Sequence, residues 1–141
     1  MSFLLTEKRI LLGISGGIAA YKTADWTRNL RREGAEVRVM MSRAAERFIT
    51  PLTMAALSGH EVYSDIFAVD DAERIPHISL GRECDLILLA PATANTIARL
   101  AHGLADDLVT AVVLAAKAKV LICPAMNSAM YQHPATKANL A

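Results

Sequence analysis

The stretch that most constrains the fold of this 141-residue chain runs from Leu86 to Thr96, Leu-Ile-Leu-Leu-Ala-Pro-Ala-Thr-Ala-Asn-Thr. Its first half is an unbroken apolar run, which is typical of a central parallel strand that helices cover on both faces. We expect the strand to end at Pro91, because proline cannot donate a hydrogen bond to a sheet ladder. A helical pattern follows from Thr93. Such a strand-turn-helix unit predicts either a plain helix cap or a ligand site at the helix N-terminus.

The rest of the chain alternates short apolar runs with helical patterns. Strands are predicted over residues 9–14, 36–41, 61–63, 86–90 and 119–123, and helices over 18–33, 51–57, 93–102 and 107–116. We expect Gly34 to end the helix before it, a polar loop over 65–76, a segment 77–84 that leads into the central strand, a helical turn over 126–131 and one more helix from Pro134. Short loops without repeats or linkers predict one α/β domain over residues 1–141, a doubly wound, Rossmann-like parallel sheet with helices on both faces.

Composition excludes several classes of protein. The net charge is +1 and no basic run is interleaved with aromatic residues, so nucleic acid is not an expected partner. No apolar stretch approaches the ~20 residues of a membrane span, and the N-terminus lacks the order of a signal peptide, so we expect a cytoplasmic protein without a membrane partner. Apolar residues make up 53% of the chain, which favours self-association. Cys84 and Cys123 do not have metal-ligand spacing, so no metal site is expected.

Four of the predicted strands are followed by turns that carry Ser, Thr, Asn or Gly. These turns are residues 15–17, 42–43, 91–96 and 124–127. Ligands of doubly wound proteins bind at the carboxyl ends of the strands, where these turns meet. The agreement between four separate turns therefore predicts a ligand site more strongly than any one of them does.

The turn Gly13-Ile14-Ser15-Gly16-Gly17 can be compared with three known functional motifs. It lacks the Gly-x-Gly-x-x-Gly fingerprint, and Ser42-Arg43 stands where a ribose-binding acid would be, so NAD is disfavoured. It fits the letters of a nucleophile elbow, but that serine belongs in mid-sheet with an acid and a histidine downstream, so a hydrolase is a minor alternative. A phosphate cradle is favoured, with hydroxyls from Ser15 and Ser42 and charge from Arg43. One phosphate without a ribose acid suits flavin mononucleotide (FMN), although a plain tight turn also explains the glycines.

Four motifs occur in a fixed order along the chain: Ser-Gly-Gly-Ile-Ala-Ala-Tyr-Lys at 15–22, Pro-His-Ile-Ser-Leu at 76–80, Pro-Ala-Thr-Ala-Asn-Thr at 91–96 and Pro-Ala-Met-Asn-x-x-Met-Tyr at 124–131. Together they resemble the homo-oligomeric flavin-containing cysteine decarboxylase family. The resemblance covers essentially the whole chain, and Pro-x-Met-Asn-x-x-Met is its most specific part. Within the family, the members that decarboxylate 4′-phosphopantothenoylcysteine in coenzyme A biosynthesis are the most similar.

The resemblance implies an FMN-dependent carboxy-lyase that holds FMN between the subunits of a homotrimer, with trimers assembling further, as in a homododecamer. It implies that His77 is the catalytic histidine and that Asn127 binds the carboxylate end of the substrate. The implied FMN contacts are Ser15, Gly16, Gly17, Ile18, Ser42, Phe48, Thr93, Ala94, Asn95 and Met126.

The implied reaction explains these residue types. A saturated cysteine carboxylate loses CO₂ slowly because nothing stabilises the carbanion. Oxidation of the thiol carbon to a thioaldehyde supplies an electron sink, and the flavin that accepts the hydride later returns it, which gives 4′-phosphopantetheine without net redox change. A histidine of near-neutral pKa suits the proton transfers. A neutral asparagine can hold a carboxylate without adding a charge that discourages its departure.

Simpler interpretations stay open beside these roles. On pattern alone, His77 fits a structural histidine, Asn127 a helix cap, and Met126 and Phe48 core filling. The same architecture also serves flavin prenyltransferases and non-catalytic FMN-binding regulatory subunits. The resemblance further implies a substrate-covering flap with a cysteine, and the sequence ends at Ala141 before it. We therefore expect a truncated domain that binds FMN and carries out the oxidative half-reaction but completes turnover poorly.

Overall fold

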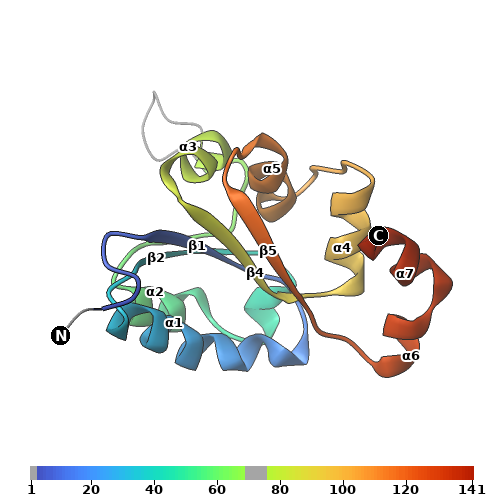
Figure 1. The fold of residues 1–141 in the computed structure, drawn as a ribbon, viewed down its shortest axis with the longest axis horizontal. Coiled ribbons are helices and arrows are strands. Elements are labelled where there is room, and N and C mark those ends of the chain that lie inside the picture. Colours follow the sequence, from blue (N-terminus) through green and yellow to red (C-terminus); the bar gives the residue numbers. More distant parts are fainter. Residues whose placement is uncertain (1–2, 69–75) are drawn as a thin grey trace.

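The computed structural model describes residues 3–68 and 76–141 and contains a five-stranded parallel sheet in the order β3-β2-β1-β4-β5. The strands are β1 (Arg9–Ile14), β2 (Glu36–Met41), β3 (Val62–Tyr63), β4 (Leu86–Ala92) and β5 (Lys119–Pro124). One face carries α1 (Thr23–Arg32) and α2 (Pro51–Ser58), and the other carries α3 (Pro76–Glu83), α4 (Ala94–Ala101) and α5 (Leu108–Ala115) (Figure 1). The predicted doubly wound α/β fold is confirmed.

Successive side chains of β1 belong to two different layers of the core. Leu12 and Ile14 pack with residues of α1 and α2, whereas Leu11 packs with residues of α3, α4 and α5. All three are essentially inaccessible to solvent. A strand that is covered on both faces must be apolar at every position, which is why β1 and β4 lack the polar alternation of a half-exposed strand.

The single helix predicted for residues 18–33 is two elements. A 3₁₀ turn, η1 (Ile18–Lys22), precedes α1. Its tight geometry is seen in the bond from the Ala20 N–H to the Gly17 carbonyl, and Thr23 Oγ1 donates to the Ala20 carbonyl at 2.6 Å where the two elements join. The predicted stop is confirmed, because Gly34 follows α1 with a φ of +95°, a conformation that favours glycine.

The prediction that the central strand ends at Pro91 was wrong. β4 continues to Ala92, which pairs with Pro124 of β5 after an irregularity in the ladder. Pro91 lacks an N–H group, but its carbonyl oxygen accepts from the Ser15 N–H at 3.2 Å and from the Ser15 hydroxyl at 2.6 Å. The residue therefore takes part in the sheet as an acceptor, a role that the missing donor does not affect.

Helix α3 was not predicted from the sequence, which gave residues 77–84 only as a lead into the central strand. Ile78 and Gly81 are weak helix formers, so local propensity says little here. The helix is instead fixed by close packing on α5. A Cβ built on Gly81 would lie 3.2 Å from the Val112 carbonyl oxygen and from Ala116 Cβ. In the preceding predicted loop, residues 69–75 lie outside the described residues.

The helices predicted for 51–57, 93–102 and 107–116 are confirmed as α2, α4 and α5. Each begins with a side-chain cap, in which Thr50, Thr93 or Asp107 accepts from the backbone N–H three residues on. A short 3₁₀ turn, η2 (Ala45–Arg47), follows β2. After β5 the chain forms α6 (Ser128–Gln132) and α7 (Pro134–Leu140) at the right of Figure 1. Within the described ranges, the structure contains no helix with the length and apolarity needed to span a membrane.

The burial of Leu12 in the core predicts how much its truncation destabilises the fold. Leu12 is 0% exposed, so Leu12→Ala is expected to lower the free energy of unfolding by about 2–5 kcal/mol, because the removed methyl groups leave a void that the sheet cannot close. Leu4, which is 83% exposed, is the matched control, and Leu4→Ala should change the free energy of unfolding by less than about 0.5 kcal/mol. Urea titration followed by circular dichroism measures both, and equal effects would contradict the assigned core.

Candidate functional site

A cavity of about 1260 Å³ opens at the carboxyl edge of the sheet. Segments that follow all five strands line it, namely residues 16–19, 42–44, 64–67, 93–96 and 125–127, together with side chains around the start of α5. The neighbouring strands β1 and β4 form the topological switch point of this strand order, where ligands of doubly wound proteins bind. The predicted convergence of the strand-end turns is therefore confirmed.

Most of the residues selected from the sequence lie in this one cavity although they are far apart in the chain. Those that line it are Gly16, Gly17, Ile18, Ser42, Thr93, Ala94, Asn95, Met126 and Asn127. Ser15, Phe48 and His77 do not line it. The surroundings of each group show what it can offer to a ligand.

Ser15 lies behind the cavity wall and is 2% exposed. Its hydroxyl donates to the Pro91 carbonyl at 2.6 Å and accepts from the Thr93 N–H at 2.9 Å. A serine has one hydroxyl hydrogen, and here it is already donated within the chain. Ser15 therefore braces the turn between β4 and α4, and its hydroxyl hydrogen is not free to be donated to a phosphate as expected. The FMN contact of Ser15 stays a prediction.

The two glycines after Ser15 have different reasons to be glycine. A Cβ on Gly16 would lie 2.4 Å from Ala44 Cβ and 2.8 Å from the Ala44 carbonyl carbon, so Gly16 is required by backbone packing. A Cβ on Gly17 would meet only Thr93 Cγ2, at an ordinary 3.4 Å. The missing side chain of Gly17 is therefore not required by packing within the protein, and it leaves space in the cavity.

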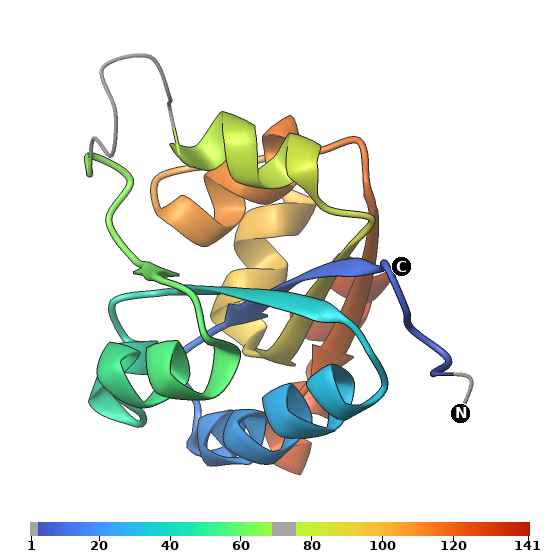
Figure 2. The ribbon, with the colours of Figure 1, turned by 90° about the vertical axis from the view of Figure 1, so that its left-hand side faces the viewer.

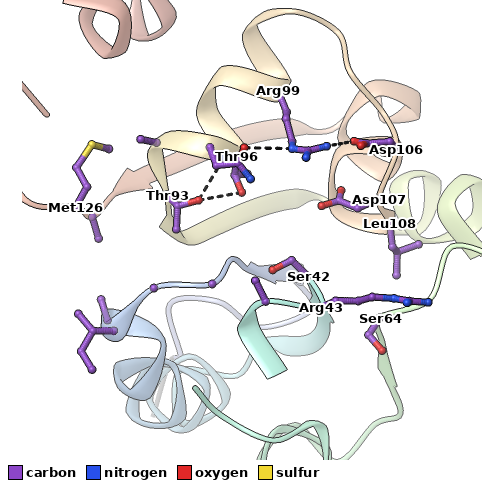
Figure 3. A pocket seen from close by; sticks show the side chains of 18 of the residues that line it. Ser42, Arg43, Ser64, Thr93, Thr96, Arg99, Asp106, Asp107, Leu108 and Met126 are labelled. Atoms are coloured by element: carbon purple, nitrogen blue, oxygen red, sulfur yellow. Dashed lines mark hydrogen bonds and ion pairs between the residues drawn. The ribbon is translucent and has the colours of Figure 1, made fainter. Parts of the chain in front are cut away.

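The turn after β2 supplies a hydroxyl and a cation. Ser42 Oγ accepts from the Ala45 N–H at 3.2 Å, and its own hydrogen has no partner within the described part of the chain. Arg43 is exposed and makes no ion pair or hydrogen bond with any described residue. Figure 3 shows its side chain extended along the cavity beside Ser64. Both groups are available to an anionic ligand.

The turn after β4 is a helix cap that also faces the cavity. Thr93 Oγ1 accepts from the Thr96 N–H at 3.2 Å and contacts the Thr96 hydroxyl at the same distance. The cap interpretation of Thr93 is therefore correct, and it does not exclude a ligand, since Thr93, Ala94 and Asn95 all line the cavity. Asn95 is exposed, and its Oδ1 accepts from Arg99 Nε at 3.4 Å.

The sequence analysis missed the ion pair between Arg99 and Asp106 at the cavity wall. The hydrogen bond to the Asp106 carboxylate raises the pKa of Arg99, and the guanidinium in turn lowers the pKa of Asp106. Both groups are therefore charged at neutral pH. The spacing of Asn95 and Arg99 places them on one helix face, but Asp106 follows a chain reversal that no sequence pattern marks.

The turn after β5 contributes an amide and sulfur atoms. Asn127 Oδ1 accepts from the Ala129 N–H at 2.8 Å and caps α6, as its pattern suggested, while its NH₂ group has no partner among the described residues. Met126 and Met130 line the cavity, as does Ile18. In Figure 3, Met126 lies at the end of the cavity opposite Arg43. Arg43 lies at the end of the cavity where Figure 3 also shows Asp107 and Leu108.

His77 and Phe48 stand apart from this cavity. His77 opens α3, and its Nδ1 is buried without a hydrogen-bond partner in the part of the chain that the structure describes. Helix α3 runs against the direction of the strands, so its first turn lies toward the carboxyl edge of the sheet (Figure 2). Phe48 follows η2 and is 48% exposed, outside the cavity lining.

The whole sequence can be compared with known proteins. Residues 2–141 match the model of the family described as Flavoprotein. The chain belongs to the Flavoprotein family. Individual relatives and solved structures with the same fold show which members of the family it is similar to.

Two curated relatives of this flavoprotein differ in length. The "Coenzyme A biosynthesis bifunctional protein CoaBC" of Vibrio vulnificus is 55% identical over 137 residues, which are 97% of this chain and 34% of the relative. The chain therefore spans about a third of the length of that relative. The "Probable phosphopantothenoylcysteine decarboxylase" of Streptococcus mutans is 51% identical over 136 residues, which cover 95% of this chain and 76% of the relative.

The fold of the flavoprotein is also found among solved structures. The FMN-dependent cysteine decarboxylase SpaF superposes with a TM-score of 0.91 and 35% sequence identity. The match covers 96% of this chain and 78% of that chain. The five-stranded parallel sheet and its helical layers are therefore those of a known enzyme fold.

The two glycines of the flavoprotein cavity make opposite predictions. Gly16→Ala forces Ala44 backbone to move, so we expect the free energy of unfolding to fall by about 1–3 kcal/mol. Gly17→Ala should leave it unchanged or raise it by up to about 1 kcal/mol, since the φ of −139° suits any residue. The added methyl group should nevertheless raise the Kd for FMN at least about tenfold by filling the cavity.

Chemical denaturation and quenching of flavin fluorescence measure these two effects separately. Gly103→Ala is not a suitable control because its φ is +66°, whereas Ala19→Gly in the same wall tests whether any backbone change at this turn has the same effect. A Gly17→Ala protein that binds FMN as tightly as the native chain would contradict the proposed use of the space at Gly17.

Proposed function

We propose that this chain is an FMN-dependent decarboxylase domain that converts 4′-phosphopantothenoylcysteine to 4′-phosphopantetheine in the cytoplasm. The observation that carries the proposal is the convergence of Gly17, Asn95 and Asn127, from three separate strand ends, on one cavity. The relative from S. mutans, which is named for this decarboxylation and shares half of its residues with the chain, supports the substrate.

The cavity fits FMN on several independent features of the chain. The hydroxyl of Ser42 and the guanidinium of Arg43, which has no counter-ion among the described residues, suit the phosphate. The apolar side chains of Ile18 and Met126 suit the edge of a flat aromatic ring, and the missing side chain of Gly17 leaves space for the cofactor. When bound, FMN supplies a two-electron acceptor that takes a hydride from the cysteine moiety and returns it after CO₂ is lost.

The volume of the cavity leaves room for a substrate beside the cofactor. About 1260 Å³ exceeds the ~300–1,000 Å³ of a typical small-molecule site. Asn127 suits the substrate carboxylate, because its Oδ1 is held by the Ala129 N–H and its NH₂ group is left to donate. A neutral donor binds the carboxylate without the full charge that would oppose the loss of CO₂.

The place of His77 supports an assembly of several copies. His77 does not line the cavity of its own chain, although the resemblance implies that it handles the proton of the substrate thiol. If FMN lies between subunits of a homotrimer, His77 of a second copy completes the site. Ile18, 78% exposed, and Met130, 49% exposed, are apolar side chains at the cavity that such an interface would cover.

Carboxyl-labelled 4′-phosphopantothenoylcysteine tests the proposal, because released labelled CO₂ reports decarboxylation whether or not the thiol product leaves. The native chain should purify with or take up FMN and release CO₂. His77→Gln and Asn127→Ala should each lower the rate by about 10²–10⁴-fold, the usual contribution of a proton-transfer group or of substrate orientation. His60→Gln, which changes a histidine outside the cavity, is the control.

Mixed oligomers decide whether the site is shared between copies. Coexpressed His77→Gln and Asn127→Ala chains should recover part of the activity, because some interfaces then combine an intact His77 with an intact Asn127. A native chain that cannot be reconstituted with FMN would refute the proposal. Binding of FMN with no CO₂ release, and with no effect of His77→Gln on any property, would favour a non-catalytic FMN-binding subunit instead.

A further inference from the structure

Two arginines line the cavity, and their surroundings differ. Arg43 has no partner among the residues that the structure describes, whereas Arg99 is engaged by Asn95 and by Asp106. We propose that Arg99 is a positioning residue, which holds the Asn95 amide with its oxygen turned away and its NH₂ group offered to the ligand. The inference rests on the proposed function, since the ligand is taken to be FMN.

The contacts hold the Arg99 side chain from two sides. Its Nε donates to Asn95 Oδ1 at 3.4 Å across one turn of α4, and its Nη1 is paired with the Asp106 carboxylate in the segment before α5 (Figure 3). The Arg99 side chain is 31% exposed, against 65% for Asp106, so the guanidinium is the more enclosed partner. Arg99 therefore ties the first turn of α4 to the start of the α5 region at the cavity wall.

This arrangement decides which end of the Asn95 amide faces the ligand. The oxygen and nitrogen of an asparagine amide are nearly the same size, so neighbouring groups determine its orientation. A guanidinium can only donate, and it therefore selects the amide oxygen. The Asn95 NH₂ group has no partner among the described residues and remains for a ligand acceptor such as a carbonyl or phosphate oxygen.

The same contacts give the two arginines separate electrostatic roles. Asp106 balances the charge of Arg99, so the pair presents little net charge to the cavity. Arg43 has no such counter-ion among the described residues and is the cation that an anionic group would meet. Loss of Arg99 alone would leave the Asp106 carboxylate without its counter-ion, so the orientation of Asn95 is tested by removing both charges of the pair together.

Titration of the ligand-free protein with FMN tests this division. Arg99→Gln combined with Asp106→Asn, which keeps the net charge of the cavity, should raise the Kd for FMN about three- to tenfold, the range expected for one misoriented hydrogen bond, and should shift the visible absorption of the bound flavin. Arg99→Lys should not restore the native Kd, because one ammonium group cannot replace a planar fork that serves two acceptors. Arg28→Gln, on the exposed side of α1, is the matched control and should bind FMN as the native chain does.

A double-mutant cycle shows whether Arg99 acts through Asn95. Asn95→Ala should weaken FMN binding, and adding Arg99→Gln with Asp106→Asn should weaken it no further, whereas independent roles would add. Thermal unfolding of each ligand-free variant separates a loss of fold from a loss of orientation. A native Kd in Arg99→Lys, additive effects in the cycle, or an unchanged Kd in the protein with Arg99→Gln and Asp106→Asn would each overturn the inference while FMN binding by the native chain upholds the proposed function. A native chain without FMN binding would refute both.

Discussion

The hydroxyl of Ser15 is the contact on which the geometry of the site depends. It joins the end of β1 to the Pro91 carbonyl and to the N–H of Thr93, and so fixes the start of α4 relative to the neighbouring strand. These two strands form the switch point of the sheet, where their connections leave toward opposite faces. A small displacement of Ser15 relative to Thr93 would move Gly17 and Asn95 apart, because each lies two residues from one of these two residues.

The fold could be predicted where the pattern of a segment reflects its own burial. The unbroken apolar run Leu86–Leu89 indicated a strand covered on both faces, and it forms part of β4. Thr93 and Asp107 marked the starts of helices because their caps involve residues that are close in sequence. Helix α3 escaped prediction because the packing of Gly81 on α5 holds it, a contact between distant segments. The end of β4 was misjudged for a similar reason, since the partner of Pro91 lies 76 residues away in the chain.

The site could be predicted as a place more readily than as a set of contacts. Strand-end turns must meet in a doubly wound sheet, so the location followed from topology. The role of each group depends on which of its atoms are already engaged, and the sequence does not record that. Ser15 was expected to donate to a ligand, yet its hydrogen is used by Pro91, while Arg99 and Asp106 carry no motif and form an ion pair in the cavity wall.

Ligand recognition in this cavity is best understood from the groups that the fold leaves unsatisfied. Thr93, Asp107 and the amide oxygen of Asn127 are spent on helix caps. The groups left without a partner among the described residues are mostly of one kind, namely the hydroxyl hydrogen of Ser42, the NH₂ groups of Asn95 and Asn127, and the guanidinium of Arg43. These are donors, so the cavity is complementary to a ligand rich in acceptors and negative charge, such as a flavin phosphate with a carboxylate substrate. The capping contacts that shape the turns thus also affect what the site can bind, because they engage acceptor atoms and leave donors for the ligand.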